Sequence, residues 1–160
     1  MARGKRIIVF SDTHGRERAM IDILEKEAYA YIFLGDGERE LDRMRERYPD
    51  KRIYNVRGNC DFASSAPDID LLSVDGVRIM FTHGHNHGVK YSTDRLFYLA
   101  KQNEISVMLF GHTHCRHLEY DEGVYIMNPG SAAAPRDFKK PSYGYIDITD
   151  KGVFCAHADL

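Results

Sequence analysis

Residues 6–15 have the sequence RIIVFSDTHG, in which a short apolar run ends in a cluster of polar residues and glycine. The run at residues 6–10 is typical of a buried β-strand. Similar runs follow it, separated by charged segments whose apolar residues have helical spacing. These later strands and helices are predicted at residues 30–34, 52–56, 16–28 and 38–48. The alternation predicts a βαβαβ unit, and therefore a parallel sheet.

The second half of the chain has a different pattern, in which short apolar runs are joined by tight turns. Asp75-Gly76 separates two such runs, which is typical of a two-residue hairpin. The predicted elements are strands at residues 69–74, 77–81, 106–110, 117–120, 124–127, 143–148 and 153–157, and a helix at residues 93–103. We therefore expect mainly antiparallel pairing here, and an α/β protein with two facing sheets and helices outside them.

Length and composition indicate a globular protein. The chain has 160 residues, of which 43% are hydrophobic and 29% charged, and we expect one domain over residues 1–160. The formal net charge of -2 argues against a general nucleic-acid-binding surface, since such domains are strongly basic. No apolar segment is long enough for a membrane span or a signal peptide, and three cysteines do not suggest a disulfide framework. We therefore expect a cytoplasmic protein without membrane partners.

Five of the predicted strands end in a cluster that places glycine beside Asp, Asn or His. The clusters lie within residues 11–15, 35–37, 58–61, 82–85 and 111–114. Ligands of open α/β sheets bind outside the carboxyl ends of strands, and glycine lets the backbone turn sharply there. One such cluster alone is explained by a simple turn, but an ordered set of five is not. Most of the eight histidines of the chain are therefore expected to mark a site, whereas His117 and His157, which lie in predicted hairpin strands, are expected on the surface.

The spacing within two clusters indicates metal ligands. Asp12 and His14 are separated by one residue, as are His112 and His114. In extended backbone, residues i and i+2 lie on the same face, so each pair can present two ligands to one metal or to two adjacent metals. Carboxylate, imidazole and amide donors suit borderline divalent ions better than Cu(I) or an iron–sulfur cluster.

The order D-x-H, GD, GN-x-D, GH and GH-x-H resembles the calcineurin-like metallophosphoesterase superfamily. The short length, the GNCD sequence at residues 58–61 and the NPGS sequence at residues 128–131 resemble its small YfcE-like phosphodiesterases. The resemblance extends from Asp12 to about Ser131. It implies a four-layer αββα sandwich of two mixed β-sheets flanked by helices, which holds two divalent metal ions. Manganese is the expected metal, with nickel, iron, cobalt and zinc as alternatives.

Matching the superfamily motifs to this sequence implies seven metal ligands. One metal would be held by Asp12, His14, Asp36 and His114, and the other by Asp36, Asn59, His83 and His112. Asp36 would bridge the two metals. The resemblance further implies that a hydroxide bridging the metals attacks phosphorus directly, so that a small phosphodiester is hydrolysed without a covalent enzyme intermediate.

The catalytic candidates lie beside these ligands. Cys60 stands where the superfamily usually has a histidine that serves the leaving group, and a thiol is a poorer acid. We therefore expect aryl phosphodiesters to be hydrolysed far better than alkyl ones. Asp61 either orients a ligand or water, or caps a turn. His85 is expected to contact substrate or protonate the leaving group, whereas His87 is expected to be a solvated loop residue.

Two other functions are compatible with the same motifs. A phosphomonoesterase or nucleotidase would need extra cationic contacts, because monoesters carry more negative charge, and no motif contains a dense Arg/Lys cluster. A non-catalytic, Vps29-like protein-interaction scaffold would have a degraded metal site, whereas all seven expected ligands are present here. Self-association into a homo-oligomer stays open at this point.

Overall fold

The computed structural model describes residues 4–160. Its elements are β1 (Lys5–Phe10), α1 (Glu17–Leu24), β2 (Ala30–Phe33), α2 (Glu38–Arg47), β3 (Ile53–Asn55), β4 (Ile69–Val74), β5 (Val77–Thr82), α3 (Asp94–Gln102), β6 (Val107–Leu109), β7 (Arg116–Asp121), β8 (Val124–Pro129), β9 (Ser142–Thr149) and β10 (Gly152–Asp159). Residues 1–3 lie outside the described residues, and one domain over residues 1–160 stays a prediction.

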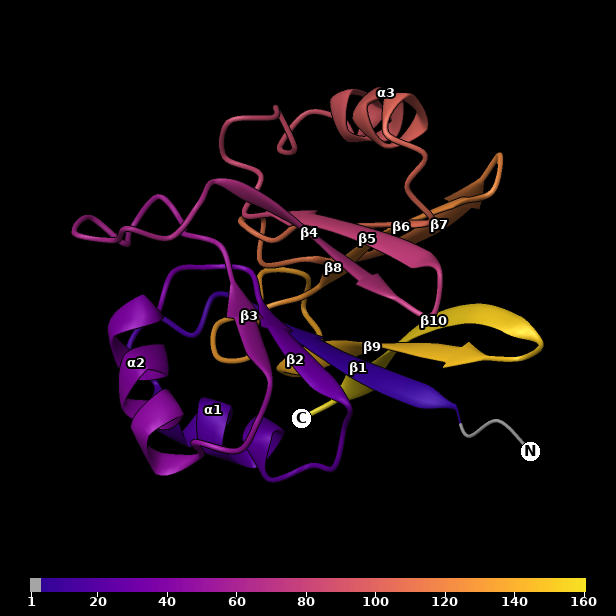
Figure 1. Ribbon diagram of the computed structural model, residues 1–160. Helices are drawn as coiled ribbons and strands as arrows, with labels where there is room; N and C mark the ends of the chain where they lie inside the picture. Colours follow the sequence, from indigo (N-terminus) through magenta and orange to yellow (C-terminus); the bar gives the residue numbers. More distant parts are fainter. Residues whose placement is uncertain (1–3) are drawn as a thin grey trace.

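The strands form two five-stranded sheets that face each other (Figure 1). The first has the order β10-β9-β1-β2-β3, and the second has the order β4-β5-β6-β8-β7. Helices α1 and α2 cover the outer face of the first sheet, and α3 covers the outer face of the second (Figure 1). Both sheets contain parallel and antiparallel pairs. The structure thus confirms the predicted four-layer αββα sandwich of two mixed sheets.

The pairing in the second sheet corrects one prediction. The strands β5, β6 and β8 are parallel neighbours, whereas mainly antiparallel pairing is expected from the sequence of this half. The hairpin of β7 and β8 is antiparallel as predicted, but β8 rather than β7 lies beside β6. The parallel arrangement brings the carboxyl ends of β5, β6 and β8 to one edge. The polar clusters that follow these strands therefore meet at that edge.

Alternating side chains of β1 pack on opposite faces of the first sheet and fix the strand in place. Ile7 and Val9 point into the core between the two sheets, while Ile8 and Phe10 pack against the layer of α1 and α2. All four side chains are almost completely buried. This period of two is what a strand covered on both faces requires. The chain that leaves β1 at Phe10 therefore starts from a fixed position.

The first helix is shorter than its sequence predicts. Its apolar spacing predicts a helix over residues 16–28, but α1 ends at Leu24. The Tyr29 amide already donates to the Arg6 carbonyl at 2.8 Å, so the chain has rejoined the sheet before β2 begins. Pairing with β1 thus outweighs the helix propensity of residues 25–28. None of the helices in the described part of the chain is long and apolar enough to cross a membrane.

Candidate metal centre

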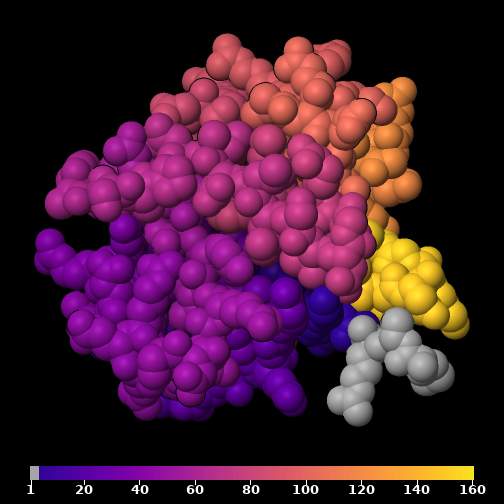
Figure 2. All heavy atoms as spheres, in the orientation of Figure 1, coloured from indigo at the N-terminus to yellow at the C-terminus, as the bar shows by residue number. Residues whose placement is uncertain are grey.

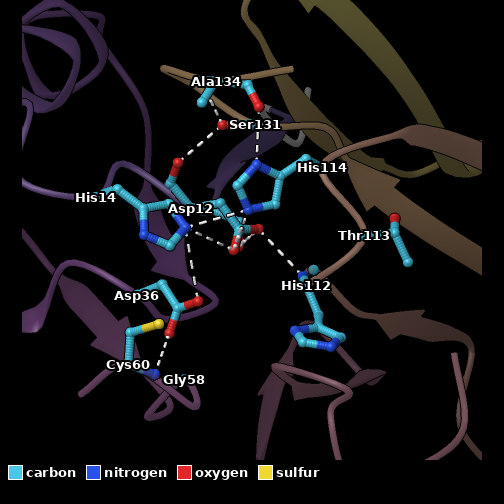
Figure 3. A network of polar contacts seen from close by, with 12 residues as sticks. Asp12, His14, Asp36, Gly58, Cys60, His112, Thr113, His114, Ser131 and Ala134 are labelled. Atoms are coloured by element: carbon cyan, nitrogen blue, oxygen red, sulfur yellow. Dashed lines mark hydrogen bonds and ion pairs between the residues drawn. The ribbon is translucent and has the colours of Figure 1, made fainter. Parts of the chain in front are cut away.

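The seven residues expected as metal ligands lie together where the two sheets meet. Figure 3 shows Asp12, His14, Asp36, His112 and His114 at this place. They come from the segments that follow the carboxyl ends of five different strands. Asp12 and His14 follow β1, Asp36 follows β2, Asn59 follows β3, His83 follows β5, and His112 and His114 follow β6. The first sheet thus supplies four of these residues and the second sheet three.

One group of donor atoms surrounds the Nε2 atom of His14. This atom lies 3.1 Å from His114 Nε2 and 3.6 Å from Asp36 Oδ2. Asp12 Oδ1 lies 3.4 Å from His114 Nε2 and 3.8 Å from His14 Nε2. These separations bring Asp12, His14 and His114 around one point, with Asp36 beside His14. That all four hold the first metal stays a prediction.

A second group of donor atoms lies on the other side of Asp36. His83 Nε2 lies 3.3 Å from Asp36 Oδ2 and 2.9 Å from Asn59 Oδ1. His112 Nδ1 lies 3.0 Å from the same Asn59 oxygen. Asp36 Oδ2 therefore faces both groups, which is the position that a bridging ligand needs.

Backbone carbonyls orient two of the imidazoles. His83 Nδ1 lies 2.7 Å from the Leu34 carbonyl, and His114 Nδ1 lies 2.8 Å from the Ala134 carbonyl. A carbonyl only accepts hydrogen bonds, so in each ring Nδ1 carries a proton. In the neutral rings, Nε2 is then left with a lone pair that points at the carboxylates. Metal-binding histidines are held in this way.

An orphaned buried oxygen shows that these donors fit a metal. Asp12 is completely buried, and its Oδ1 has no hydrogen-bond partner among the described residues. A buried carboxylate oxygen without a partner is costly, and here it faces imidazole nitrogens whose lone pairs also point inward. A cation between them satisfies every one of these atoms. The buried Asp and His groups are therefore consistent with a site for two divalent metals.

The backbone of the ligand segments is strained. Five ligands have positive φ angles: Asp12 (57°), His14 (43°), Asp36 (62°), His112 (71°) and His114 (59°). Left-handed backbone costs roughly 1–2 kcal/mol for a residue with a Cβ atom. Such strain persists where the surrounding structure requires it, most often at functional sites.

Electrostatic interactions keep the carboxylates ionised. Burial alone would raise the pKa of Asp12, but the nearby imidazoles of His114 and His14 hold that pKa below its usual range. Burial opposes ionisation of Asp36 too, and His83 nevertheless lowers its pKa. Burial, followed by repulsion from His83, lowers the pKa of His112 to about 4, so this imidazole is neutral at neutral pH. Ionised carboxylates and neutral imidazoles are the forms that bind metals.

Asp61 fixes the backbone around the bridging carboxylate. Its carboxylate accepts hydrogen bonds from the amides of Asp36 and Gly58, both at 2.8 Å, and of Gly37 and Glu38 at 3.0 and 3.1 Å. The last two amides begin α2, so Asp61 caps that helix from a distant loop. The sequence left open whether Asp61 orients a ligand or caps a turn. Its hydrogen bonds do both, because they hold the backbone of Asp36 and cap α2. Its place in catalysis stays a prediction, as a positioning residue.

Cys60 lies beside the first group of donor atoms (Figure 3). Its amide donates to Asp36 Oδ1 at 2.7 Å, and its Sγ lies within 4.8 Å of donor atoms of His14 and Asp36. Burial and then the negative charge of Asp36 raise the pKa of the thiol. Cys60 therefore stays protonated at neutral pH, next to the expected position of the phosphoryl group.

His85 lies beside the second group rather than within it. Its ring centroid is 5.4 Å from that of His83 and 6.1 Å from that of His112. Its Nδ1 is buried and lacks a hydrogen-bond partner among residues 4–160. Burial, followed by repulsion from His83, lowers the pKa of His85. A contact between His85 and substrate stays a prediction.

Supporting residues were harder to predict. Ser131 Oγ donates to the Asp12 carbonyl at 2.8 Å, and Asn128 Nδ2 donates to Thr113 Oγ1 at 3.0 Å. These bonds fix the segments that carry Asp12 and the ligands His112 and His114.

The position of His157 corrects a prediction, because the sequence suggests a surface residue. It is half-buried, and its Nε2 lies 2.6 Å from the Asn128 carbonyl. The NPGS sequence at residues 128–131 was the available signal for this support.

An αββα sandwich that gathers carboxylates and imidazoles at its strand ends has an arrangement suited to a two-metal hydrolase. The model of the calcineurin-like phosphoesterase superfamily domain matches residues 6–151. The chain therefore belongs to this superfamily.

Bacterial proteins resemble the chain over most of their length. It is 34% identical to "Probable metallophosphoesterase YsnB" of Bacillus subtilis, over 89% of this chain and 83% of the relative. It is 29% identical to "Phosphodiesterase YfcE" of Escherichia coli, over 89% of this chain and 87% of the relative. The crystal structure of a predicted phosphoesterase from Streptococcus pneumoniae superposes with a TM-score of 0.87 at 26% identity, over 99% and 91% of the two chains.

Proposed function

We propose that this protein is a metal-dependent phosphodiesterase that uses two divalent metals, with manganese as the expected ion. The observation that carries the proposal is the position of Asp36 Oδ2, which faces both groups of donor atoms. When bound, two such ions supply Lewis acidity and lower the pKa of a coordinated water to ~7, so that a nucleophile for phosphorus exists at neutral pH.

The residues of the chain would hold the reacting groups in place. We assign Asp12, His14, Asp36 and His114 to one ion, and Asp36, Asn59, His83 and His112 to the other. The hydrogen bonds that His83 and His114 donate through Nδ1 to the Leu34 and Ala134 carbonyls support this assignment, because they leave Nε2 free in each ring. Cys60 remains protonated beside Asp36 and would donate a weak hydrogen bond to the leaving oxygen.

The charges around the site favour diesters over monoesters. A monoester carries more negative charge and needs more cationic contacts than a diester. Among the residues lining the cavity beside the centre, Arg39 is the sole Arg or Lys, and the carboxylates of Asp36, Glu38, Glu40, Asp42 and Asp61 belong to the same lining. The complete donor set supports an enzyme rather than a Vps29-like scaffold. A cytoplasmic location, self-association and the lack of membrane or nucleic-acid partners stay predictions.

The test measures bound metal and metal-dependent hydrolysis in the same preparations. Purified protein is analysed for metal content and assayed with bis(para-nitrophenyl) phosphate and para-nitrophenyl phosphate, before and after chelation and after readdition of manganese. We expect chelation to lower diesterase activity at least ~100-fold and manganese to restore it. Activity that survives complete removal of metal contradicts the proposal. A faster reaction with the monoester favours a phosphomonoesterase.

Replacement of Cys60 by histidine tests the leaving-group prediction. The wild-type protein should hydrolyse aryl diesters far faster than alkyl diesters, because a protonated thiol is a poor acid. Cys60→His should speed alkyl diester hydrolysis by about 10-fold or more, since a well-placed general acid contributes roughly 10²–10⁴-fold. Hydrolysis of aryl diesters should change little, because a good leaving group needs no proton.

The matched control for this replacement is Cys60→Ala, which removes the thiol without adding an acid. It should leave the ratio of aryl to alkyl rates as high as in the wild-type protein, or raise it. Comparable aryl and alkyl rates in the wild-type protein would refute the prediction.

A further inference from the structure

Cys60 lies on the open side of the first group of donor atoms. Its Sγ, one ring nitrogen of His14 and one carboxylate oxygen of Asp36 all lie within 4.8 Å of one another. His14 and Cys60 are exposed, and the three residues help to line a cavity of about 550 Å³. Figure 2 shows the surface hollowed between the purple segment that contains α2 and the magenta loop after β3. The sulfur therefore lies between the donors of the centre and the cavity.

We propose that Cys60 is an additional ligand of the first metal, and that its sulfur binds zinc but not manganese. The inference rests on the proposed function, because it concerns an ion held at the same centre. With zinc, the sulfur would close the side of the centre that faces the cavity, and a phosphoester would have less access. Manganese would be held by oxygen and nitrogen donors alone, which leaves that side open.

The types of donor explain why zinc and manganese should differ. Thiolate is a soft ligand that binds zinc at about 2.3 Å, whereas manganese suits carboxylates, carbonyls and water. A coordinated thiol is deprotonated, so formation of the bond between sulfur and zinc breaks the S–H bond and releases one proton to solvent. No electron is transferred. The sulfur therefore discriminates between two ions that the carboxylates and imidazoles of the centre both accept.

An orphaned oxygen on the other side of His14 shows that an ion belongs at this place. Asp12 Oδ1 is buried without a hydrogen-bond partner among the described residues, and it lies 3.8 Å from His14 Nε2. His14 belongs both to the group formed with Asp12 and His114 and to the trio that contains Cys60. The imidazole that would share an ion with Asp12 thus also lies beside the sulfur.

The hydrogen bonds around Cys60 hold its position and suit an ionised sulfur. The Cys60 amide donates to Asp36 Oδ1 at 2.7 Å, and Asn59 Nδ2 donates to Cys60 Sγ at 3.6 Å. Asp61 fixes the same loop, because it accepts from the Gly58 amide at 2.8 Å. A hydrogen bond becomes stronger when its acceptor is charged, so the contact from Asn59 favours a thiolate. The loop thus supplies both a fixed position and a donor for the sulfur ligand.

Cobalt absorption tests the sulfur ligand directly. Cobalt(II) accepts the same donors as zinc, and a thiolate bound to cobalt gives an intense charge-transfer band in the near ultraviolet. Cobalt chloride is titrated into reduced, metal-free protein of full length. We expect the band in the wild-type protein and its complete loss in Cys60→Ser, which replaces sulfur by oxygen at an exposed position. No band in the wild-type protein at saturating cobalt, or the same band in Cys60→Ser, would overturn the inference.

The matched control is Cys115→Ser. Cys115 directly follows the expected ligand His114, as Cys60 follows Asn59, but its sulfur belongs to none of the donor groups found among residues 4–160. This variant should keep the cobalt band of the wild-type protein. A band that is lost in Cys115→Ser would show that a different sulfur binds the metal.

Affinities for zinc and manganese test the selectivity. Replacement of a residue that only supports a metal ligand costs about 10–100-fold in affinity, so loss of a direct ligand should cost at least as much. We expect Cys60→Ser to weaken the binding of one zinc equivalent at least ~10-fold in competition with a chromogenic chelator. Manganese binding, followed by electron paramagnetic resonance, should not change. Equal losses of affinity for the two ions would contradict the selectivity.

Alkylation provides an independent measurement on the wild-type protein. Iodoacetamide reacts with accessible thiols, and mass spectrometry of the peptides reports Cys60 and Cys115 separately. Zinc should protect Cys60 from alkylation, whereas manganese should not, and neither ion should change the reaction of Cys115. Equal protection of Cys60 by both ions would mean that a nearby ion merely blocks access to the thiol, against the inference.

Hydrolysis of bis(para-nitrophenyl) phosphate separates this inference from the proposed function. The wild-type protein should be at least about 10-fold less active with zinc than with manganese, because a catalytic ion needs an open position. Cys60→Ser should lose most of this difference, and an unchanged difference would show that the sulfur does not close the centre. If manganese supports hydrolysis but cobalt gives no band, the inference alone is wrong. If no metal supports hydrolysis, the proposed function is wrong, and the cobalt and alkylation experiments still decide whether Cys60 is a ligand.

Discussion

Asp36→Asn should lower kcat/KM for bis(para-nitrophenyl) phosphate by roughly 10³-fold, the equivalent of about 4 kcal/mol of transition-state stabilisation. Asp36 Oδ2 faces both groups of ligands, at 3.6 Å from His14 Nε2 and 3.3 Å from His83 Nε2. A neutral amide there offers one weaker donor and removes a negative charge from between two cations. Metal analysis of the purified variant should therefore show loss of bound metal together with loss of activity.

Thermal stability provides a second measurement for the same variant. At a metal concentration of about 100 times Kd, binding should stabilise the wild-type protein by roughly 2.7 kcal/mol, or about 5–10 °C in Tm. Asp36→Asn should lose most of this increase. Without metal, its Tm should stay close to that of the wild-type protein, because the repulsion between the buried Asp12 and Asp36 carboxylates is removed.

The matched control is Asp150→Asn, at the exposed turn between β9 and β10. It makes the same chemical change far from the strand ends that form the centre, and should retain both activity and the metal-induced rise in Tm. A variant Asp36→Asn that binds two equivalents of metal and keeps its activity would exclude Asp36 as the bridging ligand.

Gly58→Ala should destabilise the protein by about 2–3 kcal/mol and abolish most of its activity, because the added methyl group overpacks the centre. A Cβ atom at Gly58 would overlap Asp36 Oδ1 and lie only 2.5 Å from the Asp36 amide nitrogen. Neither neighbour can move freely, since Asp36 Oδ1 accepts from the Cys60 amide at 2.7 Å and the Asp36 amide donates to Asp61. Urea unfolding and diester hydrolysis measure the two effects.

Gly76→Ala is the control for Gly58→Ala. A Cβ atom there meets nothing within 4 Å, although the φ angle of +81° costs roughly 1 kcal/mol for a residue with a side chain. This variant should lose a little stability and keep full activity. If Gly58→Ala behaves in the same way, then the close approach of residue 58 to Asp36 has no influence on the centre.

The sequence predicts two facing sheets and five polar clusters from local patterns, and the four layers and the ligand set from the resemblance that those clusters carry to the metallophosphoesterase superfamily. Alternation in β1 follows from the burial of both faces, and five polar clusters follow strands that end at adjoining edges. The sharp turns of the backbone at the ligands are also reflected in the sequence, because every cluster contains a glycine. The identity and order of these residues are therefore enough to predict the candidate site, although no distance between them is known from the sequence.

What the sequence leaves open depends on distant contacts. The order β6-β8-β7 cannot be read from a hairpin signal, because that signal specifies which strands pair and not which of them lies beside β6. The cap of α2 also escapes prediction, because Asp61 reaches it from another loop. The sequence indicates Ser92 or Thr93 as the cap of α3. Ser92 Oγ accepts from the Asp94 amide at 3.3 Å, whereas the Thr93 hydroxyl donates to Glu119 at 2.6 Å. The charged segment that begins with Glu38 suggests a solvated helix face, although Glu38 lines the cavity.

The division of the ligands between two sheets has a consequence for the lifetime of the native state. Asp12, His14, Asp36 and Asn59 lie on one sheet, and the three other histidines lie on the other sheet. Loaded metals would act as cross-links between halves of the chain that are far apart in sequence. Separating the sheets would then require release of an ion first, so sub-global opening and cleavage by proteases would become slow in the loaded protein. The supply of metal would thereby determine the resistance of the protein to proteolysis as well as its activity.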